Sequence, residues 1–150
     1  MDKIDRRLLV LLQQDASRTN AELADLVGLS ASSCLRRVRR LKEAGVIERI
    51  VAVLSHAKAG RRIKAIVTIQ LERHGEAFMD RFLRKAAKEP AVAQAYSVSG
   101  ETDAVLMLRL VDMDEFDAFC ERMFDADGNV ARYYTLFILR TAKETTAIPV

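Results

Sequence analysis

Four arginines lie within five positions of the segment LSASSCLRRVRRLKE, which covers residues 29–43. They are Arg36, Arg37, Arg39 and Arg40. Guanidinium groups bind phosphates and the edge of guanine through paired hydrogen bonds, so this density of arginine is typical of a surface that contacts a polyanion. A solvated helix face would pair its bases with acids. Residues 29–50 contain six basic and only two acidic side chains, which favours a contact surface.

The positive charge of the chain is concentrated in its first part. The net charge of the 150 residues is only +3. Residues 1–60 contain 11 basic and 7 acidic side chains, whereas residues 61–150 contain 13 and 14. This asymmetry indicates a polyanionic partner for the first part alone.

Apolar residues recur at helical spacing in three segments around the arginines. These segments end near residue 14, at Gly28 and near residue 44, and the third begins after Ser30. Gly28 suits a helix end because glycine tolerates a positive φ. The third helix is expected to bury Cys34, Leu35, Val38 and Leu41. Residues 46–55 are rich in β-branched side chains and predict one or two short strands.

The short connection Gly28-Leu29-Ser30 between the second and third helices has the form of a helix-turn-helix motif. The N-terminal part of the second helix of this motif enters the major groove of double-stranded DNA. Arg37 is ambiguous, because it lies three residues after Cys34, where the simplest motif buries an apolar side chain. The candidate DNA-binding residues are Ser30, Ser32, Ser33, Arg36, Arg37, Arg40 and Lys42.

From about residue 61 the pattern becomes strand, helix, strand, strand, helix, strand. This βαββαβ order is that of a ferredoxin-like fold, an antiparallel sheet with two helices on one face. The predicted fold class is therefore α+β. The strand at residues 104–111 is apolar on both of its faces. Since a small sheet with two apolar faces requires a second cover, we expect the other face to be buried in a homodimer.

Other kinds of chemistry have little support in the sequence. Cys34 and Cys120 have no metal-ligand spacing, so no metal and no cofactor are expected. His56 and His74 stand alone, and no catalytic arrangement is recognisable. The N-terminus lacks the features of a secretory signal and no apolar run could span a membrane, so we expect a cytoplasmic, nucleoid-associated protein.

Two stretches, LSxSxCLRRVRRLKEAGVI and VSGxxD, resemble the Lrp/AsnC (leucine-responsive, feast/famine) family of transcription regulators, and the similarity extends over essentially the whole chain. It implies a winged-type helix-turn-helix domain at residues 1–48, a hinge strand or linker at 49–60, and a ligand-sensing and dimerisation domain at 61–150. It also implies dimers that assemble into rings, often octamers, on a roughly palindromic operator, and an effector that is an amino acid or a related metabolite.

The resemblance also implies the effector-binding residues, which are Ser99, Gly100, Glu101, Thr102, Asp103 and Thr135. Asp103 suits the ammonium of an amino acid, and backbone N–H groups of the turn suit its carboxylate. Each residue has a simpler explanation: Gly100 and Asp103 as parts of a hairpin turn, and Thr135 as an ordinary strand residue. The sequence departs from the family pattern at Ala104 and Tyr133, so the effector need not be leucine.

The sequence leaves two other functions open. One is a DNA-organising protein of the same fold that binds no effector. The other is an enzyme, because some proteins that resemble this family are haem-pathway decarboxylases. The scattered glycines and isolated histidines of this chain disfavour catalysis.

Overall fold

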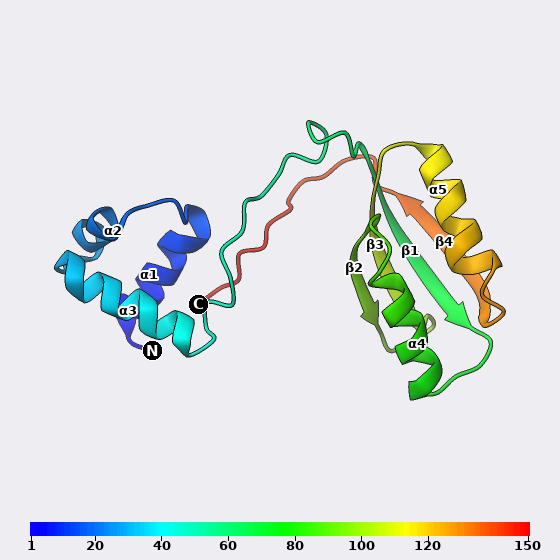
Figure 1. Ribbon diagram of the computed structural model, residues 1–150, viewed down its shortest axis with the longest axis horizontal. Helices are drawn as coiled ribbons and strands as arrows, with labels where there is room; N and C mark the ends of the chain where they lie inside the picture. Colours follow the sequence, from blue (N-terminus) through cyan, green and yellow to red (C-terminus); the bar gives the residue numbers. More distant parts are fainter. The chain divides into compact units, whose positions relative to one another are not determined.

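The chain folds into two compact units, shown in the computed structural model of Figure 1, which describes all residues from 1 to 150. One unit comprises Met1–Val53 together with Ala142–Val150, and the other comprises Leu54–Thr141. No helix has the length and apolar character needed to cross a membrane. The C-terminal tail thus groups with the first unit, whereas the sequence had placed it in a second domain that began at residue 61.

Hydrogen bonds explain why the tail belongs to the first unit. The side-chain amide of Gln13 donates to the carbonyl of Ile148 at 3.0 Å and accepts from its N–H at 2.7 Å. Both backbone groups of Ile148 are satisfied in this way, as they would be beside a neighbouring strand. A cavity of about 830 Å³ lies next to this contact, between the end of the first helix and residues 46–53.

Three helices form the body of the first unit: α1 (Lys3–Gln14), α2 (Asn20–Val27) and α3 (Ala31–Glu43). Each begins after a side chain that accepts a hydrogen bond from the first turn, as N-cap residues do. These caps are Asp2, Thr19 and Ser30. Gly28 ends α2 with φ 70°, as predicted. The core of the unit consists of Leu8, Leu23, Ala24, Cys34 and Val38.

Two expectations about this region were wrong. Leu35 is 52% exposed. Cys34, Val38 and Leu41 occupy the inward face of α3, and Leu35 is rotated about 100° around the helix axis from the preceding residue, Cys34. Residues 46–55 form no strand. A strand needs a hydrogen-bonded neighbour, and this segment has none in the single chain.

The second unit is an antiparallel sheet with helices on one face, in the predicted order (Figure 1). Its strands lie in the spatial order β2-β3-β1-β4, so the first strand is central and the second is at an edge. The elements are β1 (Ile63–Leu71), α4 (Glu76–Ala86), β2 (Val92–Ser97), β3 (Ala104–Leu110), α5 (Met113–Cys120), a π-helical turn η1 (Glu121–Asp125) and β4 (Val130–Phe137). The ferredoxin-like βαββαβ fold is confirmed.

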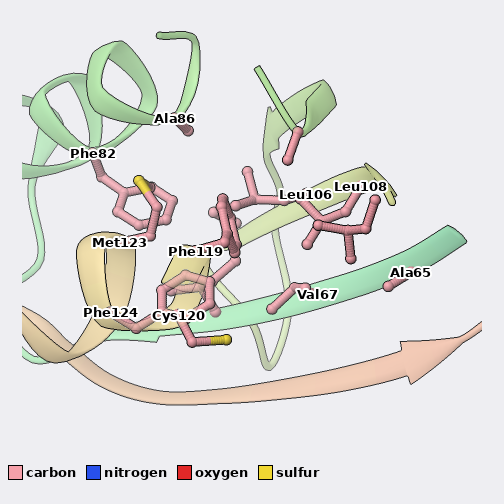
Figure 2. Close-up of a cluster of buried hydrophobic side chains, with 14 of the residues drawn as sticks. Ala65, Val67, Phe82, Ala86, Leu106, Leu108, Phe119, Cys120, Met123 and Phe124 are labelled. Carbon is pink, nitrogen blue, oxygen red and sulfur yellow. The ribbon is translucent and has the colours of Figure 1, made fainter. Parts of the chain in front are cut away.

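The helix-covered face of the sheet carries the core (Figure 2). Alternate residues of β1 and β3 are fully buried there, since successive side chains of a strand point to opposite faces. Phe82 of α4 and Phe119 of α5 pack on them. The buried strand residues are Ala65, Val67, Ile69, Leu71, Ala104, Leu106, Leu108 and Leu110.

The opposite face of the sheet has no helix over it and is rich in apolar side chains. Tyr96, Tyr134 and Leu136 are 48%, 56% and 59% exposed. Ile66 and Met107, which lie opposite each other on β1 and β3, are half-buried between them. On β3 this face carries Val105, Met107 and Arg109, so the predicted second face of this strand is mostly apolar. We refer to Tyr96, Tyr134, Leu136, Ile66 and Met107 as the open sheet face.

Candidate functional site

Exposed polar side chains cluster at the N-terminal end of α3. The hydroxyl of Ser30 accepts the backbone N–H of Ser33 at 3.2 Å, donates to the hydroxyl of Ser33 at 2.9 Å, and lies 3.2 Å from that of Ser32. The first N–H groups of a helix lack intrahelical partners and attract anions. This end of α3 therefore combines hydrogen-bonding hydroxyls with a positive end of the helix dipole.

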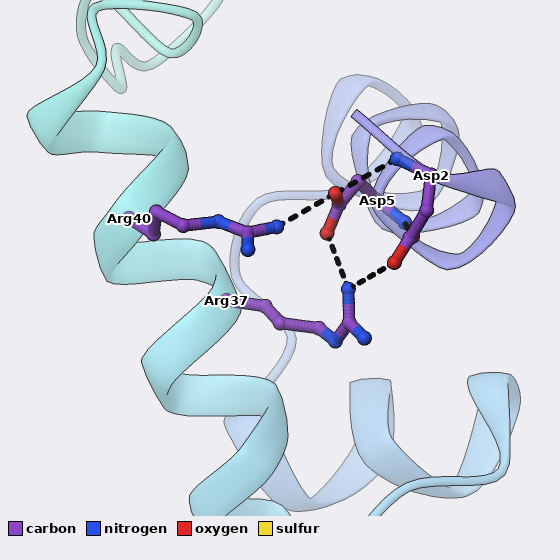
Figure 3. A network of polar contacts seen from close by, with 4 residues as sticks. All are labelled: Asp2, Asp5, Arg37 and Arg40. Atoms are coloured by element: carbon purple, nitrogen blue, oxygen red, sulfur yellow. Dashed lines mark hydrogen bonds and ion pairs between the residues drawn. The ribbon is translucent and has the colours of Figure 1, made fainter.

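The basic residues of α3 are not equivalent. Arg36 and Lys42 are exposed and form no ion pair, so their charges are free to meet a ligand. Arg39 pairs with Glu43 one turn later, at 2.8 Å, as a solvated helix face would do. Arg37 and Arg40 instead bind acids at the start of α1 (Figure 3). Only part of the arginine cluster is thus available to a polyanion.

Arg37 bridges two acids. Its Nη1 donates to Asp2 Oδ2 at 2.7 Å and to Asp5 Oδ1 at 2.8 Å. Its side chain is only 25% exposed. Arg37 therefore occupies the inward position where the helix-turn-helix pattern expects an apolar residue, and the buried acid explains why an arginine is tolerated there.

Asp5 is a buried carboxylate whose two oxygens are both hydrogen-bonded. The residue is 1% exposed. Besides Arg37, it accepts a bond from Arg40 Nη2 at 2.7 Å and one from the backbone N–H of Asp2 at 3.0 Å. Asp2 in turn accepts the N–H of Asp5, which completes a capping box at the start of α1. We refer to Asp2, Asp5, Arg37 and Arg40 as the acid–arginine network (Figure 3).

The network lowers the pKa values of its acids. Burial raises the pKa of Asp5, but the N–H of Asp2 and the two guanidinium groups outweigh it, so the pKa of Asp5 lies below its usual 3.8. The N–H of Asp5 and the hydrogen bond from Arg37 lower the pKa of Asp2 to about 2. The same contacts raise the pKa of Arg37. Asp2, Asp5 and Arg37 are therefore charged at neutral pH.

The turn at residues 99–103 is attached to the end of β1. Thr102 Oγ1 donates to the carbonyl of Ile69 at 2.7 Å, and Asp103 Oδ2 accepts the N–H of Leu71 at 2.8 Å. Gly100 has φ 124°, which few other residues adopt. Ser99 and Glu101 are exposed, and the carbonyl of Glu101 accepts a hydrogen bond from Gln70.

Asp103 also lines a cavity of about 390 Å³ beside α4. Its Oδ1 lies 3.5 Å from Nδ1 of His74, so one oxygen holds the turn and the other faces the cavity wall. The remaining wall is mostly acidic or apolar, with one serine, and consists of Leu71, Gly75, Glu76, Met79, Asp80, Leu83, Ser97 and Val98. His74 and the α4 residues are not predicted from the sequence, because no motif links them to a turn roughly 25 residues further along the chain.

Thr135 lies elsewhere in the sheet. It pairs with Val67 on the helix-covered face, and the β1 strand separates β4 from β3 and its turn. Its hydroxyl is buried without a hydrogen-bond partner, which is uncommon for a buried polar group. The single chain therefore brings the five turn residues together but not Thr135. No group of three or more potential metal ligands is present.

Comparisons with known proteins match both units. Residues 64–148 match the family model of the Lrp/AsnC ligand binding domain, and residues 1–48 match that of a winged helix-turn-helix DNA-binding domain. The leucine-responsive regulatory protein of Rhizobium meliloti is 35% identical over 150 residues, which are 100% of this chain and 96% of that protein.

Solved structures agree with this match over almost the whole chain. The crystal structure of an AsnC family transcriptional regulator from Agrobacterium tumefaciens is 34% identical, with a TM-score of 0.94, and the similarity covers 99% of this chain and 97% of that one. A transcriptional regulator from Neisseria meningitidis, solved in complex with L-Met, is 31% identical with a TM-score of 0.93 and coverages of 99% and 96%.

The acid–arginine network predicts a loss of stability in acid. Because the pKa of Asp2 is lowered from 3.8 to about 2 in the folded state, the unfolded chain takes up its proton first as the pH falls. The stabilisation that the ionised Asp2 carboxylate gives to the folded state is complete near neutral pH and is lost between about pH 4 and pH 2. Thermal unfolding by circular dichroism should show that Asp2→Asn lowers Tm near neutral pH and that this difference shrinks across that range. Asp25→Asn, which removes an acid of α2 outside the network, is the matched control. A Tm difference for Asp2→Asn that is independent of pH would contradict the prediction.

Proposed function

We propose, from the premise that this chain belongs to the Lrp/AsnC family of transcriptional regulators, that α3 reads an operator and that the second unit senses an amino acid or a related small metabolite. A DNA-binding domain is joined to a ligand-binding domain in the one chain. The matched relatives are regulators, and the chain is a DNA-binding transcriptional regulator rather than an enzyme. The proposal for α3 rests on one observation: exposed basic side chains follow a serine-rich N-terminal turn along this helix.

The residues of α3 divide between base reading and phosphate binding. Ser32, Ser33 and Arg36 lie toward the N-terminal end, which enters the major groove in helix-turn-helix proteins. Arg40 and Lys42 lie further along the helix and suit phosphates. Ser30 is proposed to lie beside a phosphate that binds the other N–H groups of the first turn, since its hydroxyl already accepts the N–H of Ser33. We assign Arg37 to the interior of the domain instead, because Asp2 and Asp5 already occupy its guanidinium.

The cavity beside Asp103 is the proposed effector site of the single chain. Its three carboxylates, from Glu76, Asp80 and Asp103, favour a ligand with a cationic group such as an ammonium. The apolar wall suits an aliphatic side chain. Gly100 and Thr102 do not line the cavity, but their backbone N–H groups in the adjoining turn are the proposed contacts of a carboxylate. The L-Met complex of the Neisseria relative supports an amino acid as the class of effector.

Ser99 and Glu101 complete the turn that we propose to contact the effector. Thr135 is a proposed contact of a different kind, because its hydroxyl is buried without a partner on the covered face of the sheet. A ligand could satisfy this hydroxyl only if the packing around it opened. A DNA-organising protein without an effector remains the second candidate function, and the acidic cavity at the turn favours the effector-responsive one.

We also propose that the open sheet face is the homodimer interface. Its exposed tyrosines and leucine give an apolar surface of the kind found at subunit contacts. Two-fold symmetry places two recognition helices on DNA, so the operator would be roughly palindromic. Assembly of dimers into a larger ring such as an octamer, and a place on the nucleoid in the cytoplasm, complete the proposal.

Base and phosphate contacts should respond differently to substitution. Arg36→Ala should weaken binding to an operator selected from a random pool by about tenfold and binding to random duplex much less, because bidentate base contacts discriminate between sequences. Arg40→Ala should weaken both and reduce the salt dependence by about one phosphate. Fluorescence anisotropy at several salt concentrations measures both effects. Unchanged operator binding by both variants would refute the proposed position of α3.

The effector site is tested by a thermal-shift screen of the twenty amino acids. We expect at least one to raise Tm, because a ligand that binds only the folded state stabilises it. Asp103→Asn should weaken binding of that amino acid by about tenfold, since a hydrogen bond between charged groups is lost. Asp117→Asn, an exposed acid on α5, is the matched control. A screen with no response would favour the DNA-organising alternative.

The dimer interface is tested by a charge placed on the open sheet face. Leu136→Asp should yield a smaller species in analytical ultracentrifugation, because an unpaired carboxylate is costly to bury at an interface. The side chain is 59% exposed in the single chain, so the fold itself should tolerate the change. Leu139→Asp, at a position that is 92% exposed, should leave the mass unchanged. If Leu136→Asp retains the wild-type mass, the interface lies elsewhere.

A further inference from the structure

We infer that Asp5 is a positioning residue for DNA binding, which acts by holding the guanidinium of Arg40 in place to meet a DNA phosphate. The inference rests on the proposed function of α3. It names a residue outside the helix-turn-helix, in the first turn of α1, as a determinant of affinity. Asp5 is negatively charged and should by itself repel DNA, yet it is expected to increase the affinity for DNA through Arg40.

Arg40 has the geometry of a supported contact residue. Its Nη2 donates to Asp5 Oδ2 at 2.7 Å, yet its side chain remains 60% exposed. One part of the guanidinium is therefore fixed against the protein, while its other N–H donors face solvent and are available to a second anion. The planar guanidinium can bind two anions at once through separate edges, which the compact ammonium of lysine does far less well.

Asp5 is itself held firmly enough to act as a support. It is 1% exposed, and its other oxygen accepts a bond from Arg37, while the N–H of Asp2 donates to the oxygen that Arg40 shares. A carboxylate fixed in this way cannot turn away when Arg40 moves. A flexible arginine would lose side-chain freedom on binding a phosphate, whereas Arg40 has already lost much of it in the folded protein.

Arg39 provides the internal comparison. It lies next to Arg40 on the same helix and also pairs with an acid, Glu43. Both members of that pair are well exposed, at 77% and 63%, so no packing around Glu43 fixes its carboxylate as a support for Arg39. The difference between the two arginines is therefore the burial of the acid and not the presence of an ion pair.

The decisive experiment replaces Asp5 with its neutral isostere. Asp5→Asn makes the protein more positive, so bulk electrostatics alone predicts tighter binding to DNA. Our inference predicts the opposite: affinity for a random-sequence duplex should fall by about tenfold, and the salt dependence by about one phosphate. Asp25→Asn removes the same charge from α2, away from the network, and should bind equally well or more tightly. If Asp5→Asn binds the random-sequence duplex as tightly as Asp25→Asn does, the inference is wrong.

A second variant decides the matter if Asp5→Asn does not fold, as judged by circular dichroism. Arg40→Lys retains the charge but cannot hold Asp5 and a phosphate together. We expect it to bind about as weakly as Arg40→Ala, whereas Arg39→Lys should stay within about twofold of the wild type. Arg40→Lys with wild-type affinity would show that only charge matters and would refute the support by Asp5. Failure of the wild-type protein to bind any duplex would instead refute the proposed function itself.

Discussion

A single buried carboxylate organises the DNA-binding unit. Asp5 is removed from water in a chain segment only a few residues from the N-terminus, and a buried charge is tolerated only when it is paired and hydrogen-bonded. Its partners are Arg37 and Arg40 of α3. The requirement to compensate Asp5 therefore links the first turn of α1 to the middle of α3. It also separates Arg37, whose guanidinium is taken up inside the unit, from Arg40, which binds Asp5 and is still 60% exposed.

The second unit follows a different principle, which is the alternation of side chains along its strands. One set of residues from β1 and β3 is completely buried under α4 and α5, and the other set is left on the open sheet face. A sheet of this kind has its core within one chain and an apolar surface that remains for another. The same strands therefore supply the core of the chain and the face that we propose for dimerisation.

The turn at residues 99–103 shows how structure and function can share a residue. Asp103 satisfies the N–H of Leu71 with one oxygen and approaches His74 with the other. The simpler explanation of Asp103 as a turn residue and its proposed role toward an effector are thus compatible. The geometry also associates the turn with the start of α4, from which most of the cavity wall comes.

The sequence by itself determined the three helices, the βαββαβ order and the family, because apolar periodicity, caps and turn residues are local properties. It also located the arginine cluster. Only the tertiary structure decided that Arg37 points inward, that Leu35 is exposed, that Thr135 lies apart from the turn, and that the tail at 142–150 contacts α1 through Gln13. Each of these depends on a contact between residues far apart in the chain. The periodicity of apolar residues predicts which face of a helix or strand is buried. Which residues elsewhere in the chain contact that face depends on the packing of the whole fold.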